Sequence, residues 1–328
     1  MPTSVRAATS DDLAAIGALL LQDATERAAA EGDLWLLATN AVERIAEAFS
    51  KEARPEGSSR WLVAEAAGSV VGVARFGVIP CPPIYHLAGG TAFVLYDDTF
   101  VGASAPGDAL TSLAVAAERE GRAMGAAIFL ATCAPFQHGK FSSLQAAGYD
   151  VVTHYLVKHR LSNPTPPASV RAATAADVPT IVAMGAESQR SLFKANARMW
   201  KPHADAPARF GAWMHYSLAL QDRRIFVMGE REFGGFVIAQ PINPFHMPLT
   251  AEREHLGLID DFWASEFAEE IIGRDFSNAR DLLVGAEAEF VQRGRTGAMA
   301  ICPAAWRSKQ NLLRACGYRD GNAWMLKA

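Results

Sequence analysis

The sequence lacks the features by which several classes of protein are recognised. Its four cysteines, Cys81, Cys133, Cys302 and Cys316, form no C-x-x-C pair, which predicts free thiols in a reducing cytoplasm. No secretory leader is evident at the N-terminus, and no apolar run is long enough to span a membrane. The eight histidines show no metal-ligand spacing. We therefore expect a cytoplasmic protein with no membrane partner and no metal site.

The sequence also lacks a charge excess and the glycine motifs that hold nucleotides. Its formal net charge of −4 argues against a general nucleic-acid-binding protein, which would need a basic face. No strand is followed by a G-x-G-x-x-G or a Walker loop. What is present is typical of a globular protein: half of the 328 residues are apolar and a fifth are charged. That length accommodates two domains of ordinary size.

An internal repeat divides the chain. Residues 4–9 and 169–174 share the six-residue run SVRAAT, and the second copy follows a proline-rich stretch at 162–168. Further on, LYDDTFV at 95–101 corresponds to LIDDFWA at 258–264. A repeat of this length indicates duplicated domains and not a solenoid. We expect domains at 1–161 and 169–328, joined by the linker 162–168.

Both halves are predicted to have the same order of elements. Thr9 and Thr174, each followed three residues later by an acid, predict a capping box at the first helix. Hairpin strands come next, and crossovers through helices follow, which favours an α+β fold around a mixed sheet. In the second half the strand that ends near residue 264 leads to a loop at 274–279, which opens a helix. The periodicity predicts the following elements: helices at 12–27, 41–49, 108–124, 136–147, 177–189, 206–220 and 305–316; strands at 61–65, 70–76, 91–101, 126–132, 151–160, 224–228, 234–240, 297–302 and 322–327.

This order, with three motifs of the second half, resembles the GNAT N-acetyltransferase superfamily. IDDFWASE at 259–266 resembles that family's fourth strand, and RDFSNARDLL at 274–283 is similar to its pyrophosphate loop. LRACGY at 313–318 resembles the end of its last helix. The resemblance covers nearly the whole chain, once per half. It implies an α+β protein of two tandem GNAT-like domains, each a mixed sheet flanked by helices.

The resemblance also implies an activity: transfer of an acetyl group from acetyl-coenzyme A to a primary amine of a small molecule or peptide, in a ternary complex. An acid on the fourth strand can take the proton of the attacking amine. Because neighbours on a strand face opposite sides, we expect only one of the two acids, Asp260, to face the slot. Asp97 is its first-half counterpart. Alternatively, Asp260 and Asp261 could both cap or brace neighbouring helices.

The expected coenzyme site lies beside that strand. In this fold the fourth and fifth strands diverge, so that backbone groups can pair with the pantetheine arm, and a helix N-terminus can hold its diphosphate. The residues predicted to bind the coenzyme are Ala264, Ser265, Arg274, Ser277, Asn278 and Ala279. Arg274 could equally be a solvated residue before a helix.

Departures from the family's pattern weaken the enzyme interpretation. Leu144 and Leu313 stand where the family has a tyrosine acid, and Ser277 replaces a loop glycine. In the first half Pro106 lacks an N–H and Asp108 would repel phosphate, so that half is expected to be degenerate. The alternative is a non-catalytic protein of this fold, acting as a coenzyme A sensor or scaffold. The aromatic residues within 193–216 could form either core or an acceptor pocket.

Overall fold

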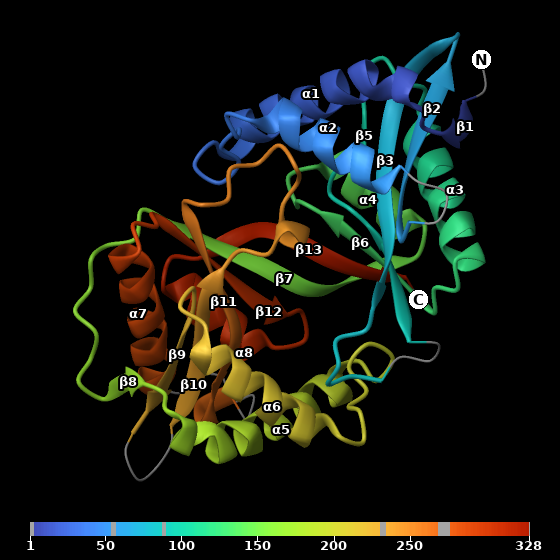
Figure 1. Ribbon diagram of the computed structural model, residues 1–328. Helices are drawn as coiled ribbons and strands as arrows, with labels where there is room; N and C mark the ends of the chain where they lie inside the picture. Colours follow the sequence, from blue (N-terminus) through green and yellow to red (C-terminus); the bar gives the residue numbers. More distant parts are fainter. Residues whose placement is uncertain (1–2, 54–56, 87–89, 230–233, 268–275, 328) are drawn as a thin grey trace.

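The computed structural model describes residues 3–53, 57–86, 90–229, 234–267 and 276–327. These residues form one continuous mixed sheet with helices packed on its faces (Figure 1). We call residues 1–161 the first half and residues 169–328 the second half. No helix in the described part of the chain combines the length and apolarity needed to cross a bilayer.

The first half carries helices that each bury one apolar stripe. In α2, for example, Ala41, Ile45 and Phe49 recur at four-residue spacing and are all buried. The helices are α1 (Leu13–Glu31), α2 (Ala41–Glu52), α3 (Ala109–Ala123) and α4 (His138–Ala146), with a 3-10 turn η1 (Ser10–Asp12) before α1. The strands are β1 (Ser4–Ala7), β2 (Ser59–Ala66), β3 (Ser69–Pro80), β4 (Thr91–Leu95), β5 (Phe100–Val101), β6 (Ile128–Cys133) and β7 (Tyr149–His159).

The second half repeats this order. Its helices are α5 (Val178–Ala195), α6 (Ala206–Ala219), α7 (Ser277–Gln292) and α8 (Arg307–Ala315), with 3-10 turns η2 (Ala175–Asp177), η3 (Pro244–His246) and η4 (Ser265–Phe267). Its strands are β8 (Val170–Ala172), β9 (Arg224–Met228), β10 (Gly235–Pro241), β11 (Leu256–Ala264), β12 (Gly297–Pro303) and β13 (Arg319–Lys327). Helices α5 and α6 pack on each other, and α7 packs on β9 and β10.

The last strands of the two halves are exchanged at the centre of the sheet. β13, from the second half, pairs with β6, whereas β7, from the first half, pairs with β12. β7 and β13 also pair with each other, as the green and red strands in the middle of Figure 1 show. Lys158 on β7 binds Glu287 at 2.8 Å and Lys327 on β13 binds Glu118 at 2.7 Å, so each strand reaches a helix of the other half.

The main sequence predictions of the fold are confirmed. Two matching sets of elements flank a mixed sheet, and Thr9–Asp12 and Thr174–Asp177 both form the predicted capping box. One predicted strand is wrong in detail: residues 91–101 are interrupted after Leu95 and resume at Phe100. The interruption falls on the acidic pair of the first half.

In both halves two parallel strands pair at their beginnings and then part. The pairing of β4 with β6 ends at Leu95 and Ala131, and that of β11 with β12 ends at Ile259 and Ala300. The predicted divergence of the fourth and fifth strands is therefore present twice. In the second half the opening leads into a cavity.

Candidate active site

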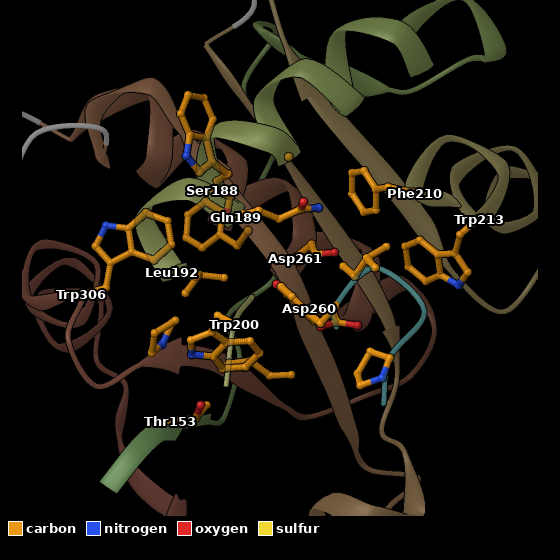
Figure 2. A pocket seen from close by; sticks show the side chains of 18 of the residues that line it. Thr153, Ser188, Gln189, Leu192, Trp200, Phe210, Trp213, Asp260, Asp261 and Trp306 are labelled. Atoms are coloured by element: carbon orange, nitrogen blue, oxygen red, sulfur yellow. The ribbon is translucent and has the colours of Figure 1, made fainter. Parts of the chain in front are cut away.

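The second half encloses a cavity of about 400 Å³ beside the point where β11 leaves β12 (Figure 2). Helices α5 and α6, strand β11 and the start of α8 supply most of its wall, and strand β7 and a loop after β3 add first-half residues. The polar and charged members of the lining are Thr153, Ser188, Gln189, Arg209, Asp260, Asp261 and Lys309, and the aromatic members are Tyr85, Tyr155, Trp200, Phe210, Trp213, Phe236, Phe262, Trp263, Trp306 and Trp324.

Asp260 and Asp261 both line this cavity, which differs from the expectation that only Asp260 would face the slot. The cause is a bulge in β11. Val237 pairs with Phe262 and Ala239 with Ile259, so two residues of β11 lie opposite the single residue between them on β10. A bulge of this kind breaks the alternation of side chains along a strand. Figure 2 shows the two carboxylates on neighbouring positions of the strand.

The two carboxylates have little compensation from the described residues. Gln240 Nε2 donates to Asp260 Oδ2 at 2.8 Å, and no hydrogen bond or ion pair reaches Asp261 from the residues the structure describes. Burial raises the pKa of Asp260. Burial, and then the negative charge of Asp260, raise the pKa of Asp261 to about 7. A carboxyl group with that pKa exchanges a proton readily at neutral pH.

Aromatic side chains surround the carboxylates. Gly185 on α5 lets α6 approach, because a Cβ at that position would lie 2.5 Å from the Phe210 ring. Phe210 and Trp213 stack with their ring centroids 6.2 Å apart, and Trp200 completes the wall. Three of the aromatic residues between 193 and 216 therefore line the cavity, whereas Phe193 and Tyr216 are exposed.

A first-half loop closes one side of the cavity. The Tyr85 ring packs edge-on against Trp200 with centroids 5.2 Å apart. The backbone N–H of His86 donates to Lys201 O at 2.7 Å, and that of His203 donates to Ile84 O at 2.9 Å. In Figure 1 this cyan loop reaches the yellow segment between α5 and α6. The cavity is thus complete only when both halves are present.

The N-terminus of α7, where a diphosphate was predicted, already holds an anionic group. The carboxylate of Glu266 accepts hydrogen bonds from the backbone N–H of Asn278 at 3.1 Å and of Ala279 at 2.9 Å. Ser277 begins the helix beside them. Arg274 lies outside the described residues. The backbone N–H groups and the helix dipole at this end favour an anion, and the Glu266 carboxylate of the chain itself occupies the position.

The gap between β11 and β12 is likewise occupied in part. The buried Lys309 ammonium donates to Phe262 O at 2.8 Å, and its pKa is lowered by burial. Trp306 Nε1 donates to Phe267 O at 3.3 Å. Ser265 N donates to Gly234 O, so this amide is engaged with the neighbouring backbone. Ala264 is fully buried at the end of β11, beyond the pairing with β12.

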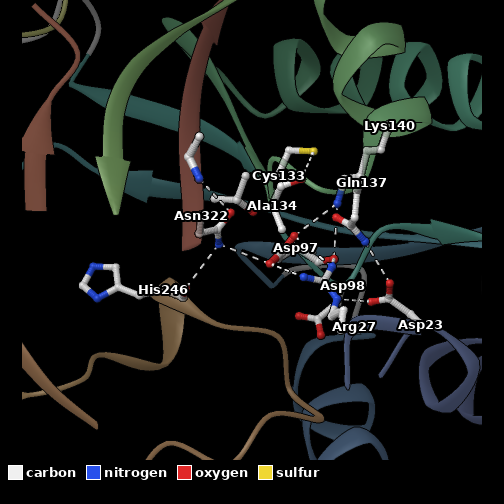
Figure 3. A network of polar contacts seen from close by, with 12 residues as sticks. Asp23, Arg27, Asp97, Asp98, Cys133, Ala134, Gln137, Lys140, His246 and Asn322 are labelled. Atoms are coloured by element: carbon white, nitrogen blue, oxygen red, sulfur yellow. Dashed lines mark hydrogen bonds and ion pairs between the residues drawn. The ribbon is translucent and has the colours of Figure 1, made fainter. Parts of the chain in front are cut away.

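The first-half counterpart of the cavity is filled by ion pairs (Figure 3). Arg27 binds Asp97 through both terminal nitrogens, at 2.9 and 3.0 Å, and its Nε binds Asp23 at 2.7 Å. Lys140 lies 3.4 Å from Asp97, and Asn322 of the second half donates to the same carboxylate. Burial alone would raise the pKa of Asp97, but the charges of Arg27 and Lys140 lower it. The predicted base Asp97 therefore sits in a closed network.

Sequence reasoning missed several residues that shape these two sites. Lys140 and Lys309 stand eight residues before Gly148 and Gly317, and Glu118 and Glu287 each bind the tyrosine that follows those glycines. Aligning charged positions across the repeat could have found all four. Tyr85 lies in a proline-rich turn whose partner is more than a hundred residues away, and nothing local indicates its role.

Comparison with solved structures places the fold. A GCN5-related N-acetyltransferase from Sphaerobacter thermophilus is 16% identical over 99% of this chain and 95% of that chain, with a TM-score of 0.57. A tandem GNAT protein from the clavulanic acid biosynthesis pathway is 14% identical over 99% of this chain and 97% of its own, with a TM-score of 0.50. No protein-family model and no curated protein sequence matches. At these identities the likeness shows the fold, which is the tandem GNAT fold.

Proposed function

We propose that this chain is an acetyl-coenzyme A-dependent N-acetyltransferase whose second half acts on a primary amine of a small molecule or peptide. The observation that carries the proposal is the bulge of β11, which sets Asp260 and Asp261 together in a cavity where β11 parts from β12. In a tandem GNAT fold, this gap is where an acyl thioester and an amine would meet. The fold likeness supports acyl transfer in general, and the cavity supports an amine as acceptor.

The contribution of the chain's own residues would be to bind the acceptor and to take its proton. An amine enters as an ammonium ion, and it must lose one proton to attack and another after the new bond forms. Asp261, with a pKa of about 7, suits the acceptance of such a proton, and Asp260 would hold the ammonium beside it. The proton of the departing thiol would come from water or from the carboxyl pair.

The first half would act as a structural partner. Its loop with Tyr85 and its strand β7 with Tyr155 supply part of the cavity wall, whereas its own acidic pair is neutralised internally. We therefore propose that the duplicated domain no longer turns over substrate and instead completes the acceptor site.

Coenzyme A fits the site only after two side chains move. The parted strands and the position of the α7 N-terminus suit the coenzyme. The obstacles are the Glu266 carboxylate, which accepts from Asn278 and Ala279, and the Lys309 ammonium, which donates to Phe262 O. A diphosphate would have to displace Glu266 to use the amides of Asn278 and Ala279.

The test is a thiol-release assay with acetyl-coenzyme A and a panel of primary amines. We expect turnover that Asp260→Asn and Asp261→Asn each lower at least tenfold, while Asp97→Asn, if it folds, leaves the chemical step unchanged. Release that is independent of added amine, or equal in the Asp260→Asn variant, would sink the proposal. Circular dichroism confirms that each variant is folded.

Glu266 and Lys309 also favour a second candidate, a binding protein of this fold with no catalytic activity, in which coenzyme A acts at most as a sensed ligand. Calorimetry with coenzyme A separates the two. If the native chain does not bind coenzyme A but the Glu266→Ala variant does, the Glu266 carboxylate blocks the coenzyme site. That result would favour the sensor or scaffold interpretation. If neither binds, acyl transfer from coenzyme A is excluded.

A further inference from the structure

We propose that the second-half cavity binds an organic monocation, with its ammonium or guanidinium head between Asp260 and Asp261 and an apolar body against the aromatic wall. The inference rests on the proposed function in that it concerns the same cavity, but it holds whether or not the bound molecule is acylated. It comes from comparing the two acidic pairs of the repeat, because the first half supplies cations of its own at the corresponding places.

The first of these cations is Arg27. The shared capping boxes align Asp12 with Asp177, and both helices then run without interruption, so Asp23 corresponds to Ser188 and Arg27 to Leu192. Arg27 is 1% exposed and binds Asp97 through two nitrogens. Leu192 lines the second-half cavity instead. The guanidinium of Arg27 thus fills, in the first half, the space that corresponds to the cavity beside Leu192 in the second half.

The second cation is Arg75, which binds the other acid of the first pair. Its Nη1 lies 2.8 Å from Asp98. Phe76 pairs with Leu95 and Gln240 pairs with Leu258, so the strand registers align Arg75 with Ala239. Ala239 is buried and carries no charge. Both arginines that neutralise the first acidic pair are therefore replaced by apolar residues beside the second.

The lysine common to both halves does not make up the difference. Lys140 lies 3.4 Å from Asp97, whereas Lys309 donates to the Phe262 carbonyl oxygen. Within the described residues, Gln240 alone donates to Asp260, and Asp261 has no hydrogen-bond donor. Against the effect of burial, the charge of Lys309 lowers the pKa of both carboxyls, and that of Arg223 lowers the pKa of Asp260, but neither cation forms an ion pair with them among the described residues. Two adjacent carboxyl groups without an ion-pair partner are costly to ionise together. A cationic ligand would supply the missing ion pair.

The rest of the wall restricts the remainder of the ligand. Beyond the carboxylates the cavity is lined by Leu192, Trp200, Phe210 and Trp213. The described charged groups that line it are Asp260, Asp261, Lys309 and Arg209. Arg209 is a cation, so a second positive charge on the ligand would meet repulsion or an aromatic surface. These features favour an arylalkyl monocation over a diamine.

Calorimetry on the full chain tests the inference with matched probes. We use 2-phenylethylamine, 2-phenylethylguanidine, neutral 2-phenylethanol and the dication putrescine, without coenzyme A. We expect at least one phenylethyl cation to bind at least tenfold more tightly than both the alcohol and the diamine. Comparing the affinities of 2-phenylethylamine and 2-phenylethylguanidine shows whether the site prefers an ammonium or a guanidinium ligand.

The decisive variant is Leu192→Arg, which installs the first-half cation in the second half. We expect it to raise the melting temperature and to abolish binding of the phenylethyl cations. Phe193→Arg is the matched control, because it adds the same side chain at the exposed neighbouring position and should leave binding unchanged. If Leu192→Arg does not fold, Asp260→Asn/Asp261→Asn takes its place and should lose the preference for cations.

The outcomes separate this inference from the proposed function. Binding of a cation without turnover in the presence of acetyl-coenzyme A would support the inference and contradict the proposed enzymatic function. Turnover of uncharged acceptors only would support the enzymatic function and contradict the inference. Equal affinity for the alcohol, unchanged binding by a folded Leu192→Arg variant, or no binding of any probe by the native chain would overturn the inference.

Discussion

The two halves place the same acidic pair at corresponding positions, after β4 in the first half and at the bulge of β11 in the second, and give it opposite surroundings. In the first half Asp97 and Asp98 are each bound by an arginine, and the space around Asp97 is closed. In the second half Asp260 and Asp261 have no such partner among the described residues and border a cavity. The comparison shows that the same carboxylate pair can be neutralised by arginines of the chain, as in the first half, or left without an ion-pair partner beside a cavity, as in the second.

The scaffold, in contrast, is the same in both halves. Glu118 accepts from Tyr149 and Lys327, and Glu287 accepts from Tyr318 and Lys158. In each case the tyrosine belongs to the same half as the glutamate and the lysine to the other half. The duplicated framework has been kept while the side chains at its centre have diverged, so the differences at the acidic pairs are not part of a general loss of structure.

Separating the halves should have the largest effect. β6 and β12 each rely on the other half's last strand, so cutting the chain within 162–168 should give two fragments that stay associated, and each expressed alone should fail to fold. Size-exclusion chromatography and circular dichroism of the cut chain and of each fragment provide the measurement. Two fragments that separate as folded monomers would contradict the exchange.

Removing the internal cation of the first half should have the next largest effect. Arg27→Leu leaves Asp23 and Asp97 buried without their guanidinium, and we expect a loss of about 3–5 kcal/mol in the free energy of unfolding. Urea denaturation measures it. Lys51→Leu, which breaks an exposed pair with Glu47, is the control and should change little. Equal effects of the two substitutions would show that the network is not what stabilises the first half.

The sequence predicted the duplicated fold well and the site only in part. The repeat, the capping boxes at Thr9 and Thr174 and the strand order follow from local patterns, which the chain obeys twice. The orientation of Asp261 could not be predicted, because a bulge depends on pairing with β10. The placement of Tyr85 and the exchange of β7 with β13 depend on contacts between halves, which no local pattern records.

A pH series on the second acidic pair should sharpen the contrast with the first. The raised pKa of Asp261 means that the folded state holds a proton that the unfolded state has lost between pH 4 and 7. Stability should therefore fall as pH rises through this window, relative to Asp261→Asn. We expect the variant to match the native chain near pH 3.5 and to exceed its free energy of unfolding by on the order of 4 kcal/mol at pH 8.

The charges of Asp260 and Lys309 act on the pKa of Asp261, and the charge of Asp261 in turn contributes to raising the pKa of Tyr85. Tyr85 is the one first-half residue among these groups. Urea unfolding at each pH measures the difference, and Asp98→Asn is the matched variant on the first pair, where loss of a carboxylate bound by Arg75 should destabilise at pH 8. Stabilisation by both substitutions would remove the distinction between the halves.

The capping boxes should give the smallest effect, and an equal one. Asp12 and Asp177 each accept from the backbone N–H of the preceding threonine at 2.7 Å and from an arginine, and these hydrogen bonds lower the pKa of both carboxyls. Asp12→Ala and Asp177→Ala should each cost about 1 kcal/mol at pH 7. A lowered pKa gives its full stability above the unfolded pKa and loses it only as the pH falls through the lower, folded pKa, so the cost should be smaller at pH 3 than at pH 7 and should disappear only in stronger acid. Urea unfolding at pH 7 and pH 3 measures both effects, and a cost that differs between the two sites by more than twofold would mean that the repeat is unequal even in its scaffold.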